Sequence, residues 1–473
     1  MNSEICTKRY YVYNEVLAGI QLVKNFLQTN RHILVGGQSI DYAIRLKGGK
    51  LYEDWEIPDL DFVTDDYANV AYDIFKIIGT KLSERVNISV LNAMHPTTMR
   101  VQVAKFSVAD VTFIPTRILE MYKLSTLEYD GCLIRHPFFQ YVDIQRSFSY
   151  PYENTMMEVI THRWEKDFKR LLLTMKYYSP HDKELVSSFV SKYHIKKNSI
   201  LGKLGFKKNR LHRMSKTSPS SIVHFDSSEL LTLYKELNKT SVEKELTTIG
   251  VINGELAYLI YRSIYKNIIG NSFDHVFITG DEKRLKYKGC DYFLNSYLMT
   301  NEDKEKFFAL NPKLEDILRE TNPYIDIIPS RLICDTWELV GIEHRTAYHS
   351  INLKKINPSY PNVTVKVVSI NYLILYICML WVTLRTSIYL SLYIKLLKMI
   401  EKVYNSQDDN PMLRFLFPSI ETYGNEVPHI FERNKLSITK PANIYINKYN
   451  NLETAVNSIK KFEYQDVYNL DGM

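Results

Sequence analysis

One glycine-rich turn constrains the fold of this chain more than any other feature of its sequence. An apolar strand at residues 33–35 runs directly into Gly36-Gly37-Gln38-Ser39. Because glycine lacks a Cβ atom, the backbone can turn sharply there, and its N–H groups can approach phosphate oxygens closely. A helix that begins at Ser39 would add unpaired N–H groups and the positive end of its dipole. The segment therefore predicts a strand, a turn and a helix that bind a phosphate group.

A second apolar strand, at residues 58–62, carries two acids, Asp59 and Asp61. Side chains alternate along a strand, so both carboxylates point to one face while Leu60 and Phe62 point into the core. Two parallel carboxylates suit Mg²⁺, which takes oxygen ligands and usually shares them with substrate phosphates. Gly-Gly turns are common, and Asp-x-Asp is usually a solvated strand edge. Their order in one unit of strand, turn, helix and strand favours a combined metal and phosphate site.

A third carboxylate is expected from Asp110, the one acid in the alternating apolar strand at residues 108–113. A further strand is expected just before it, at residues 98–103. An acid in a buried strand is costly unless it is paired or bound to a metal. In two-metal chemistry such a carboxylate holds the catalytic ion and helps to deprotonate the attacking hydroxyl. The alternative is that Asp110 ends a strand in solvent.

Two further segments are expected to be helices. Residues 39–46 form an amphipathic pattern that Gly48-Gly49 would end. Residues 372–384 are apolar throughout, and residues 387–397 continue in the same way after Arg385. A membrane-spanning helix needs about twenty apolar residues without a central charge. We therefore expect a buried helix of a second lobe, and no membrane span.

Taken in order, these pieces resemble the catalytic subunit of the poly(A) polymerases of large cytoplasmic DNA viruses, of the poxvirus, African swine fever virus and mimivirus kind. The resemblance covers about residues 30–180 well and the rest loosely. Glu165 stands where a second lysine is expected. The interval between Gly37 and Asp59 exceeds the minimal pattern of the nucleotidyltransferase superfamily, which favours this viral branch over the small antibiotic-modifying enzymes. The matching pieces are Gly36-Gly37-Gln38-Ser39-Ile40-Asp41-Tyr42-Ala43, Pro58-Asp59-Leu60-Asp61-Phe62, residues 95–101, Val108-Ala109-Asp110 with Pro115 behind it, His136-Pro137, and Lys166-Asp167 with Arg170 ahead of Tyr177-Tyr178-Ser179-Pro180.

The resemblance implies an α/β (α+β) chain with a nucleotidyltransferase (polymerase-β-like) catalytic domain and a second lobe that is a degenerate nucleotidyltransferase-like domain. Residues 274–281 support the second copy, because they repeat the pattern of a strand followed by glycine, and the later strand at residues 324–328 carries only one acid. The expected division is an N-terminal helical lead (1–30), the catalytic domain (31–182), a basic linker or loop region (183–240) and a C-terminal domain (241–473).

The resemblance also implies template-independent polyadenylation, in which AMP passes from ATP to the 3′-hydroxyl of an mRNA and pyrophosphate leaves. Two Mg²⁺ or Mn²⁺ ions would be held by the metal-binding and catalytic residues Asp59, Asp61 and Asp110. ATP, the substrate, would contact Gly36, Gly37, Gln38, Ser39 and Lys166, although Lys166 could equally be an exposed helix lysine. The implied partners are the RNA 3′ end and either a second copy of the chain or a viral processivity subunit. The implied place is the viral factory in the host cytoplasm, and the virion.

Two other functions remain open. The same site could belong to a terminal transferase that adds uridine or CCA. The chain could instead be a catalytically inactive RNA-binding subunit, although an inactive copy has no reason to keep three buried acids. A nucleotide-selectivity assay separates the first of these from polyadenylation.

The net charge of +7 and pI near 8.8 permit RNA binding without demonstrating it. The basic stretch at residues 183–221 is either an RNA-contacting patch or a solvated linker. Five cysteines without Cys-x-x-Cys spacing argue against a structural zinc site or a disulfide framework, and for a reducing compartment. Residues 1–9 contain no apolar signal core, so secretion is not expected.

Overall fold

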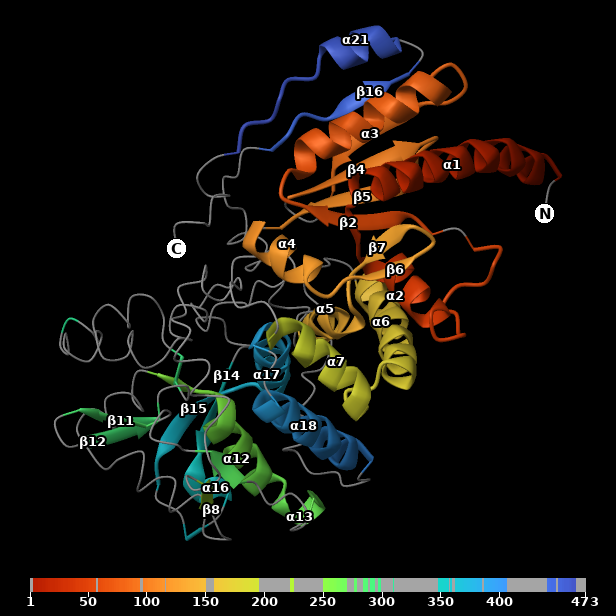
Figure 1. The fold of residues 1–473 in the computed structure, drawn as a ribbon. Coiled ribbons are helices and arrows are strands. Elements are labelled where there is room, and N and C mark those ends of the chain that lie inside the picture. Colours follow the sequence, from red (N-terminus) through yellow and green to blue (C-terminus); the bar gives the residue numbers. More distant parts are fainter. Residues whose placement is uncertain are drawn as a thin grey trace.

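A computed structural model gives the fold as two lobes, one built around an eight-stranded sheet and the other around a four-stranded sheet (Figure 1). The sequence-based expectations for His95, Pro115, residues 195–221 and residues 324–328 lie outside the described residues. The structure describes residues 3–56, 58–93, 97–114, 116–149, 157–194, 222–224, 250–269, 276–278, 284–287, 290–293, 297–298, 309, 348–356, 358–359, 362–384, 387–405, 440–447 and 450–464.

The eight strands of the larger sheet have the order β16-β3-β4-β5-β2-β1-β7-β6. We call it the catalytic sheet, because β2 and β5 carry the predicted acids. These two strands are parallel neighbours, whereas β3, β4 and β5 form an antiparallel series. The strands are β1 (Ile33–Leu34), β2 (Leu60–Thr64), β3 (Ile88–Asn92), β4 (Thr98–Val103), β5 (Phe106–Phe113), β6 (Leu127–Tyr129), β7 (Cys132–Ile134) and β16 (Ile444–Ile446).

Two long helices, α1 (Ser3–Asn30) and α3 (Tyr67–Leu82), pack on one face of this sheet. Apolar side chains of β4 and β5 alternate towards these helices, and Met99, Val101 and Val111 are fully buried among them. In α3 the buried residues recur at helical spacing, so one stripe of the helix faces the sheet. The predicted N-terminal lead is therefore helical, and it lies on the catalytic sheet.

The remaining helices of this lobe lie at the other end of the sheet, near β1 and β7 (Figure 1). Helix α2 contacts β2, β6 and β7 of the sheet and the helices α5 and α6. These helices are α2 (Gly36–Arg45), α4 (Thr116–Lys123), α5 (Pro137–Ser149), α6 (Met157–Tyr177) and α7 (Lys183–His194).

The C-terminal end of the chain returns to the catalytic sheet. Strand β16 pairs antiparallel with β3, and the short helix α21 (Leu452–Asn457) packs on α3 (Figure 1). From the sequence, all of residues 241–473 were expected in a C-terminal domain, but residues 440–464 belong to the lobe of the catalytic sheet. A three-residue strand that pairs with a partner about 350 positions earlier leaves no local sequence pattern, which is why this contact was missed.

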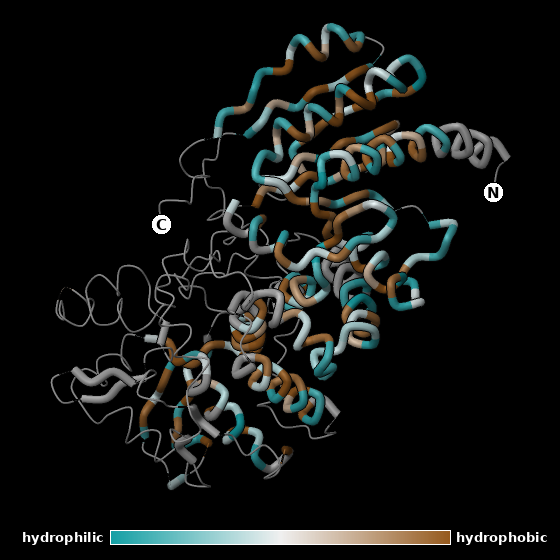
Figure 2. Tube along the Cα trace, viewed as in Figure 1, coloured by the Kyte–Doolittle hydropathy of each residue, from teal (hydrophilic) through white to brown (hydrophobic). Residues whose placement is uncertain are grey.

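The smaller sheet has the order β13-β9-β15-β14, and its helices include the predicted apolar run. That run divides between two helices, α17 and α18, and α17 is largely coloured as hydrophobic in Figure 2. Ile377 and Trp381 of α17 are fully buried, which confirms the expected buried helix. None of the helices in the described part of the chain combines the length and apolarity of a membrane span. The elements are β9 (Val251–Ile252), β13 (Tyr297–Leu298), β14 (Tyr348–Asn352), β15 (Thr364–Val368), α12 (Gly254–Ile264), α13 (Lys266–Ile269), α16 (Leu353–Ile356), α17 (Ile370–Leu384) and α18 (Ser387–Asn405).

This smaller sheet repeats the order and directions of four strands in the catalytic sheet. Strands β13, β9, β15 and β14 correspond to β2, β1, β7 and β6, with the same parallel and antiparallel pairs. Strands β1 and β9 also end alike, because a residue of extended backbone precedes a glycine of positive φ. The pairs are Val35 with Gly36 (φ 67) and Asn253 with Gly254 (φ 59).

The predicted echo at residues 274–281 lies outside this four-stranded sheet. It contains β10 (Val276–Ile278), which pairs with β8 (Ile222–His224) in a separate two-stranded sheet. A further hairpin consists of β11 (Arg284–Tyr287) and β12 (Cys290–Phe293). Strand β9, which has the place of β1 in this arrangement, shares with β1 little more than two apolar residues and one glycine, so its sequence gives no clear sign of the similarity.

The two lobes share one apolar core between α5 and α17. The rings of Phe138 and Trp381 lie with their centroids 4.9 Å apart. At the same interface the side-chain amide of Gln145 donates a hydrogen bond of 3.2 Å to the hydroxyl of Tyr393. These contacts fix α5, and with it the end of the catalytic sheet, against the second lobe.

Candidate active site

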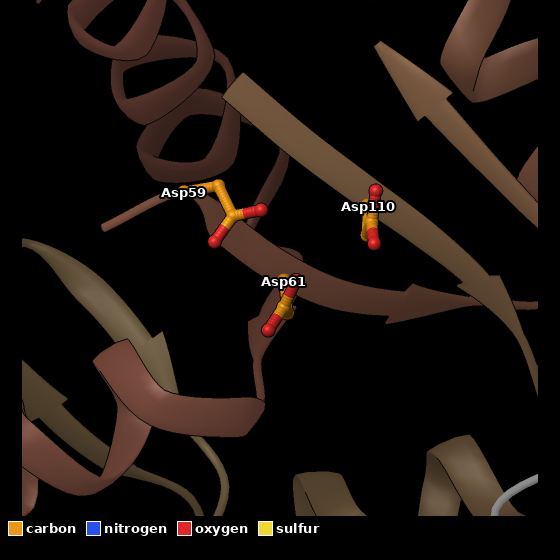
Figure 3. Close-up of side chains that lie close together, drawn as sticks. All are labelled: Asp59, Asp61 and Asp110. Carbon is orange, nitrogen blue, oxygen red and sulfur yellow. The ribbon is translucent and has the colours of Figure 1, made fainter. Parts of the chain in front are cut away.

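Three carboxylates from two adjacent strands meet at one point of the catalytic sheet. Asp59 directly precedes β2, Asp61 lies on β2, and Asp110 lies on β5 (Figure 3). The parallel register places Asp61 directly beside Asp110. One ligand oxygen from each of the three carboxylates lies within 4.8 Å of the other two. The structure therefore brings together the three acids that the sequence singled out.

The charges of this acid cluster are poorly compensated. Burial raises the pKa of Asp61 well above its ordinary value of 3.8, and the neighbouring carboxylates of Asp59 and Asp110 raise it further. Within the described part of the chain, neither Asp59 nor Asp61 forms an ion pair. Three closely spaced carboxylates of this kind fit hard divalent cations, which would offset their mutual repulsion.

Asp110 already has a cationic partner on the neighbouring strand β4. Arg100 lies directly opposite Asp110 in the antiparallel register, and its Nε and Nη2 donate to the two carboxylate oxygens at 2.8 and 2.6 Å. These hydrogen bonds raise the pKa of Arg100 above its ordinary value. The sequence analysis named Arg100 only as a strand residue. An opposite-charge pair across an expected hairpin was the signal that could have identified it.

An irregularity in the pairing of β4 with β5 brings a hydroxyl to the same acid. The register shifts between Val101 and Gln102, so β5 contains an extra residue at this point. Such a bulge changes which side chains share a face. As a result Ser107 lies on the face of Asp110, and its hydroxyl donates to the Asp110 carboxylate at 3.5 Å.

The glycine turn lies against the acid cluster. The N–H of Val35 donates to the carbonyl oxygen of Asp61 at 2.8 Å, which fixes the turn to β2. Gly36 adopts φ 67, a left-handed conformation that favours glycine. A Cβ atom on Gly36 would overlap the carboxylate of Asp61. Both the backbone angle and the close approach therefore require glycine at this position.

Helix α2 begins at Gly36, three residues earlier than the sequence analysis expected. The positive φ of Gly36 lets the chain enter the helix directly after the strand. The first four N–H groups of a helix have no partner within it, and that of Val35 is already bonded to β2. The N–H groups of Gly36, Gly37 and Gln38 therefore remain to meet an anion at this end.

Ser39 lies inside the protein and does not begin the helix. Its side chain is fully buried, and its hydroxyl accepts a hydrogen bond of 3.2 Å from the amide of Gln140 on α5. Gln140 in turn accepts a hydrogen bond from the buried guanidinium of Arg135, which also pairs with Asp143. Ser39 thus links α2 to a buried polar network. The predicted contact of Ser39 with ATP stays a prediction.

The end of α2 follows the prediction. Gly48 has φ 78, and the N–H of Gly49 donates to the carbonyl of Ile44 at 3.1 Å, so the two glycines close the helix. Asp41 then holds the segment that follows. Its carboxylate accepts hydrogen bonds from the backbone N–H groups of Leu51 and Tyr52 at 2.7 and 3.0 Å.

Tyr52 and Arg170 lie over the second glycine of the turn. The Nη2 of Arg170, on α6, donates to the Tyr52 hydroxyl at 3.0 Å. A Cβ atom on Gly37 would overlap both groups. Arg170 also lies close enough to Asp61 to lower its pKa, although less than burial and the neighbouring acids raise it. Arg170 is therefore the cation that α6 brings to the glycine turn.

Lys166, which the sequence analysis selected on this helix, is exposed one turn before Arg170. The two residues are four positions apart and so lie on the same side of α6. Arg170 is part of the resemblance to the viral family but is not among the residues predicted to contact ATP. The side chain of Glu165, where a lysine was expected, lies outside the described residues.

Comparisons with known proteins agree with this geometry. Residues 21–154 match the family model described as "Poly(A) polymerase catalytic subunit". Candidate poly(A) polymerase catalytic subunits of two African swine fever virus isolates, from Kenya and Malawi, are each 33% identical over 174 residues. The matched segment is 37% of this chain and 36% of each relative, so the chain spans little more than a third of their length.

The fold is also similar to that of a solved structure, the crystal structure of the Megavirus polyadenylate synthase. The TM-score is 0.50 at 16% sequence identity, and the similarity covers 92% of this chain and 80% of that chain. At this identity the likeness concerns the fold alone. The sequence match over residues 21–154 is the stronger evidence, and it contains the whole acid cluster and the glycine turn. Over residues 21–154 the chain is therefore similar to the family of poly(A) polymerase catalytic subunits.

Proposed function

We propose that this chain transfers AMP from ATP to the 3′-hydroxyl of RNA, releasing pyrophosphate, and so extends RNA with adenylates without a template. One observation carries the proposal. The ligand oxygens of Asp59, Asp61 and Asp110 lie within 4.8 Å of one another, and the glycine turn lies directly against Asp61. A metal-binding cluster beside an anion-binding helix end is what nucleotidyl transfer needs.

The glycine turn and α6 would bind the triphosphate. The N–H groups of Gly36, Gly37 and Gln38 are free at the start of α2 and can donate to phosphate oxygens. Arg170 lies over Gly37 with one of its donors on Tyr52, so a small movement would redirect it to a phosphate. Lys166 is exposed on the same side of α6 and could add a weaker, longer-range attraction.

Asp59, Asp61 and Asp110 would hold two divalent ions, and Asp110 would serve the ion beside the RNA 3′-hydroxyl. When bound, such ions lower the pKa of the attacking hydroxyl and neutralise charge on the leaving pyrophosphate. The raised pKa of Asp61 supports this assignment, because a cation is the natural compensation for three crowded carboxylates. Asp61 is fixed by its strand, and Arg100 orients Asp110.

The test is to incubate the purified chain with a labelled oligo-RNA, each nucleoside triphosphate separately, and Mg²⁺ or Mn²⁺. Extension with ATP alone supports adenylyl transfer, and its loss in Asp61→Asn assigns the activity to this site. Equal extension with UTP, or addition of cytidylates from CTP, would replace the proposal with one of the other terminal transferases. No extension with any nucleotide would favour an inactive RNA-binding subunit.

We further propose that the second lobe is a degenerate copy of the nucleotidyltransferase fold. Its four strands match the order and directions of β2, β1, β7 and β6, and Gly254 repeats the conformation of Gly36. Strand β13 pairs with β9 as β2 pairs with β1. The residues before β13 in the sequence are Leu294-Asn295-Ser296, without an acid, whereas Asp59 directly precedes β2 and Asp61 lies near its start. Such a copy would keep the scaffold and lack the metal ligands.

RNA and ATP are the proposed substrates. A second copy of the chain, or a separate viral subunit that increases processivity, is the proposed partner, and the viral factory in the host cytoplasm is the proposed place. Sedimentation of the purified chain tests self-association directly, and addition of RNA shows whether the assembly depends on it.

A further inference from the structure

We propose that the polar face of the catalytic sheet, opposite helices α1 and α3, binds the RNA upstream of its 3′ end, and that Tyr445 of the C-terminal strand β16 stacks on one of its bases. We call this surface the acceptor face, and define it by Ser89, Arg100, Gln102, Ser107 and Tyr445. The inference rests on the proposed function, because it takes the acid cluster to act on an RNA 3′-hydroxyl.

The two faces of the catalytic sheet differ sharply. Helices α1 and α3 pack on one face, where Met99, Val101 and Val103 of β4 are fully buried. Between these residues, Arg100 and Gln102 point to the opposite face and are partly exposed. The side chain of Arg100 is 41% exposed even in its ion pair with Asp110. The acceptor face is therefore a polar surface that begins at the acid cluster.

Strand register connects this surface without interruption to the edge of the sheet. Ser107 of β5 lies opposite Gln102, Gln102 lies opposite Ser89 of β3, and Ser89 lies opposite Tyr445. The hydroxyl of Ser89 donates to the side-chain oxygen of Gln102 at 3.1 Å, and that of Ser107 donates to Asp110. Three strand spacings separate β5 from β16, a width of about 14 Å. At about 3.4 Å per stacked nucleotide, roughly four nucleotides span it.

Tyr445 occupies a fixed position at the far side of this row. Its neighbours Ile444 and Ile446 are buried, and Ile446 reaches Gly79 of α3, so the Tyr445 ring points away from α3 and is 47% exposed. Two further hydrogen bonds hold the strand, because Asn92 donates to Asn443 at 2.8 Å and the Tyr72 hydroxyl donates to the carbonyl of Ala442 at 2.8 Å. A rigidly held, exposed aromatic ring is a stacking platform for an unpaired base.

The chemistry of the face fits single-stranded RNA better than a protein. Its hydroxyl, amide and guanidinium groups can hydrogen-bond to phosphates, 2′-hydroxyls and base edges. Apart from the acid cluster, the described residues of this row carry no negative charge. The row also contains no cluster of large apolar side chains that would anchor a protein partner. The direction from Tyr445 to Asp110 leads an RNA end towards the proposed metal site.

The experiment measures binding of a fluorescent oligo(A) RNA that ends in a 3′-deoxynucleotide, with magnesium and without ATP, so that no transfer can occur. Tyr445→Val removes the ring but keeps a residue that favours strands, and Tyr445→Phe keeps the ring. We expect Tyr445→Val to weaken binding at least about fivefold and Tyr445→Phe to bind within about twofold of the parent.

A matched pair of charge variants tests the face itself. Gln102→Glu and Ile77→Glu each add one carboxylate, the first on the acceptor face and the second at a residue 38% exposed on α3, which covers the other face. Only Gln102→Glu should weaken RNA binding by more than about threefold. Ultraviolet cross-linking of RNA that contains 4-thiouridine, followed by mass spectrometry, should attach the RNA to β16.

Several outcomes would overturn the inference. One is that the parent chain does not bind the RNA, and another is that Tyr445→Val and Gln102→Glu bind it with the parent's affinity. A third such outcome is that Ile77→Glu weakens RNA binding as much as Gln102→Glu does. A change of sedimentation in Tyr445→Val without a change in RNA affinity would assign the face to a protein partner. Failure of the proposed function is distinguishable: a chain with the expected binding pattern that extends no RNA keeps the acceptor face and loses adenylyl transfer. If instead the parent chain extends RNA normally and Tyr445→Val binds RNA with the parent's affinity, adenylyl transfer is kept and the acceptor face is lost.

Discussion

Arg100 holds Asp110 through two parallel hydrogen bonds of 2.8 and 2.6 Å from the neighbouring strand. The pair fixes the orientation of the carboxylate by two bonds, so Asp110 cannot rotate freely. It also places a cation where a divalent ion would compete for the same oxygens. The Arg100 side chain is 41% exposed, so water weakens its attraction to Asp110. A doubly charged ion can therefore displace Arg100 from the carboxylate or bind the carboxylate together with it.

The first prediction follows from this competition. Arg100→Ala should lower the magnesium concentration that gives half-maximal activity, because a positive charge beside the acid cluster is removed. For a half-exposed ion pair the change should correspond to about 1 kcal/mol or less, up to about fivefold. The matched control is Arg85→Ala, which removes an arginine whose ion pair with Glu15 is far from the site. A higher magnesium requirement in Arg100→Ala would show that orientation of Asp110 outweighs competition.

Asp110 itself gives the second prediction. Asp110→Ala should keep much of the equilibrium affinity for ATP with magnesium, because Asp59 and Asp61 would still hold the proposed ion that carries the nucleotide. Turnover should fall at least about a hundredfold, since the ion beside the attacking hydroxyl loses a ligand. Equilibrium dialysis of ATP and single-turnover extension measure the two quantities separately. Equal loss of both would mean that Asp110 serves the nucleotide and the hydroxyl alike.

The third prediction concerns Asp61 in the absence of metal. Its folded-state pKa is raised, so the folded protein prefers the protonated acid. The resulting stability is greatest below the ordinary pKa of 3.8 and is lost as pH rises through the raised folded-state pKa. At neutral pH in EDTA, Asp61→Asn should therefore melt at the same or a higher temperature than the parent, while its extension activity falls at least about a hundredfold.

The control for this prediction is Asp73→Asn, which changes an exposed acid on α3 that pairs with Lys76. Its melting temperature and activity should both stay near those of the parent. A large loss of stability in Asp61→Asn, without metal, would show that the carboxylate is needed to hold the turn at Gly36. That result would reverse the electrostatic argument.

The fourth prediction separates two cations on α6. Arg170→Ala should raise the KM for ATP by about tenfold or more, as expected when a charged hydrogen bond to phosphate is lost. Lys166→Ala should change it much less, because Lys166 is exposed and one turn further from the glycine turn. Tyr52→Phe removes the hydroxyl that holds Arg170 and tests whether that contact positions it. A larger rise of the KM in Lys166→Ala than in Arg170→Ala would show that Lys166, the residue predicted from the sequence, makes the main phosphate contact.

The parts of this site that could be predicted from the sequence are those whose pattern lies within one short segment of the chain. The alternation of Asp59, Leu60 and Asp61 fixes which side chains share a face, so the acid cluster could be predicted. Asp110 could be added because an acid in a buried strand needs a partner. Arg170 could not be selected in this way, since its contact with the glycine turn joins residues more than a hundred positions apart.

The errors have equally physical causes. Ser39 suggested a helix start because serine is a common capping residue, but the positive φ of Gly36 let the helix begin earlier. The place of β16 in the catalytic sheet depends on pairing with β3, and three residues carry no recognisable period. The second lobe repeats a geometry more than a sequence, so Gly254, which shares the positive φ of Gly36, has no recognisable sequence signal.

The fifth prediction concerns the returning C-terminal segment. The hydroxyl of Tyr464 donates to the Asp66 carboxylate at 2.7 Å and accepts from the N–H of Ala68 at 3.1 Å. Ala68 is fully buried in the first turn of α3, where helix N–H groups need an outside partner, and the Asp66 side chain does not cap the helix. Tyr464→Phe keeps the ring against Tyr67 but leaves this N–H unpaired. The free energy of unfolding should therefore fall by about 1–3 kcal/mol.

Chemical denaturation measures this change, and the midpoint should move while the slope stays constant. The matched control is Tyr129→Phe, since the Tyr129 hydroxyl makes none of the side-chain hydrogen bonds found in the described structure. Removal of residues 440–473 should cost more than Tyr464→Phe, because it also takes β16 from β3 and Phe462 from Tyr67. If the truncated chain unfolded at the denaturant concentration of the parent, the C-terminal segment would not support α3, and the capping role of Tyr464 would be wrong.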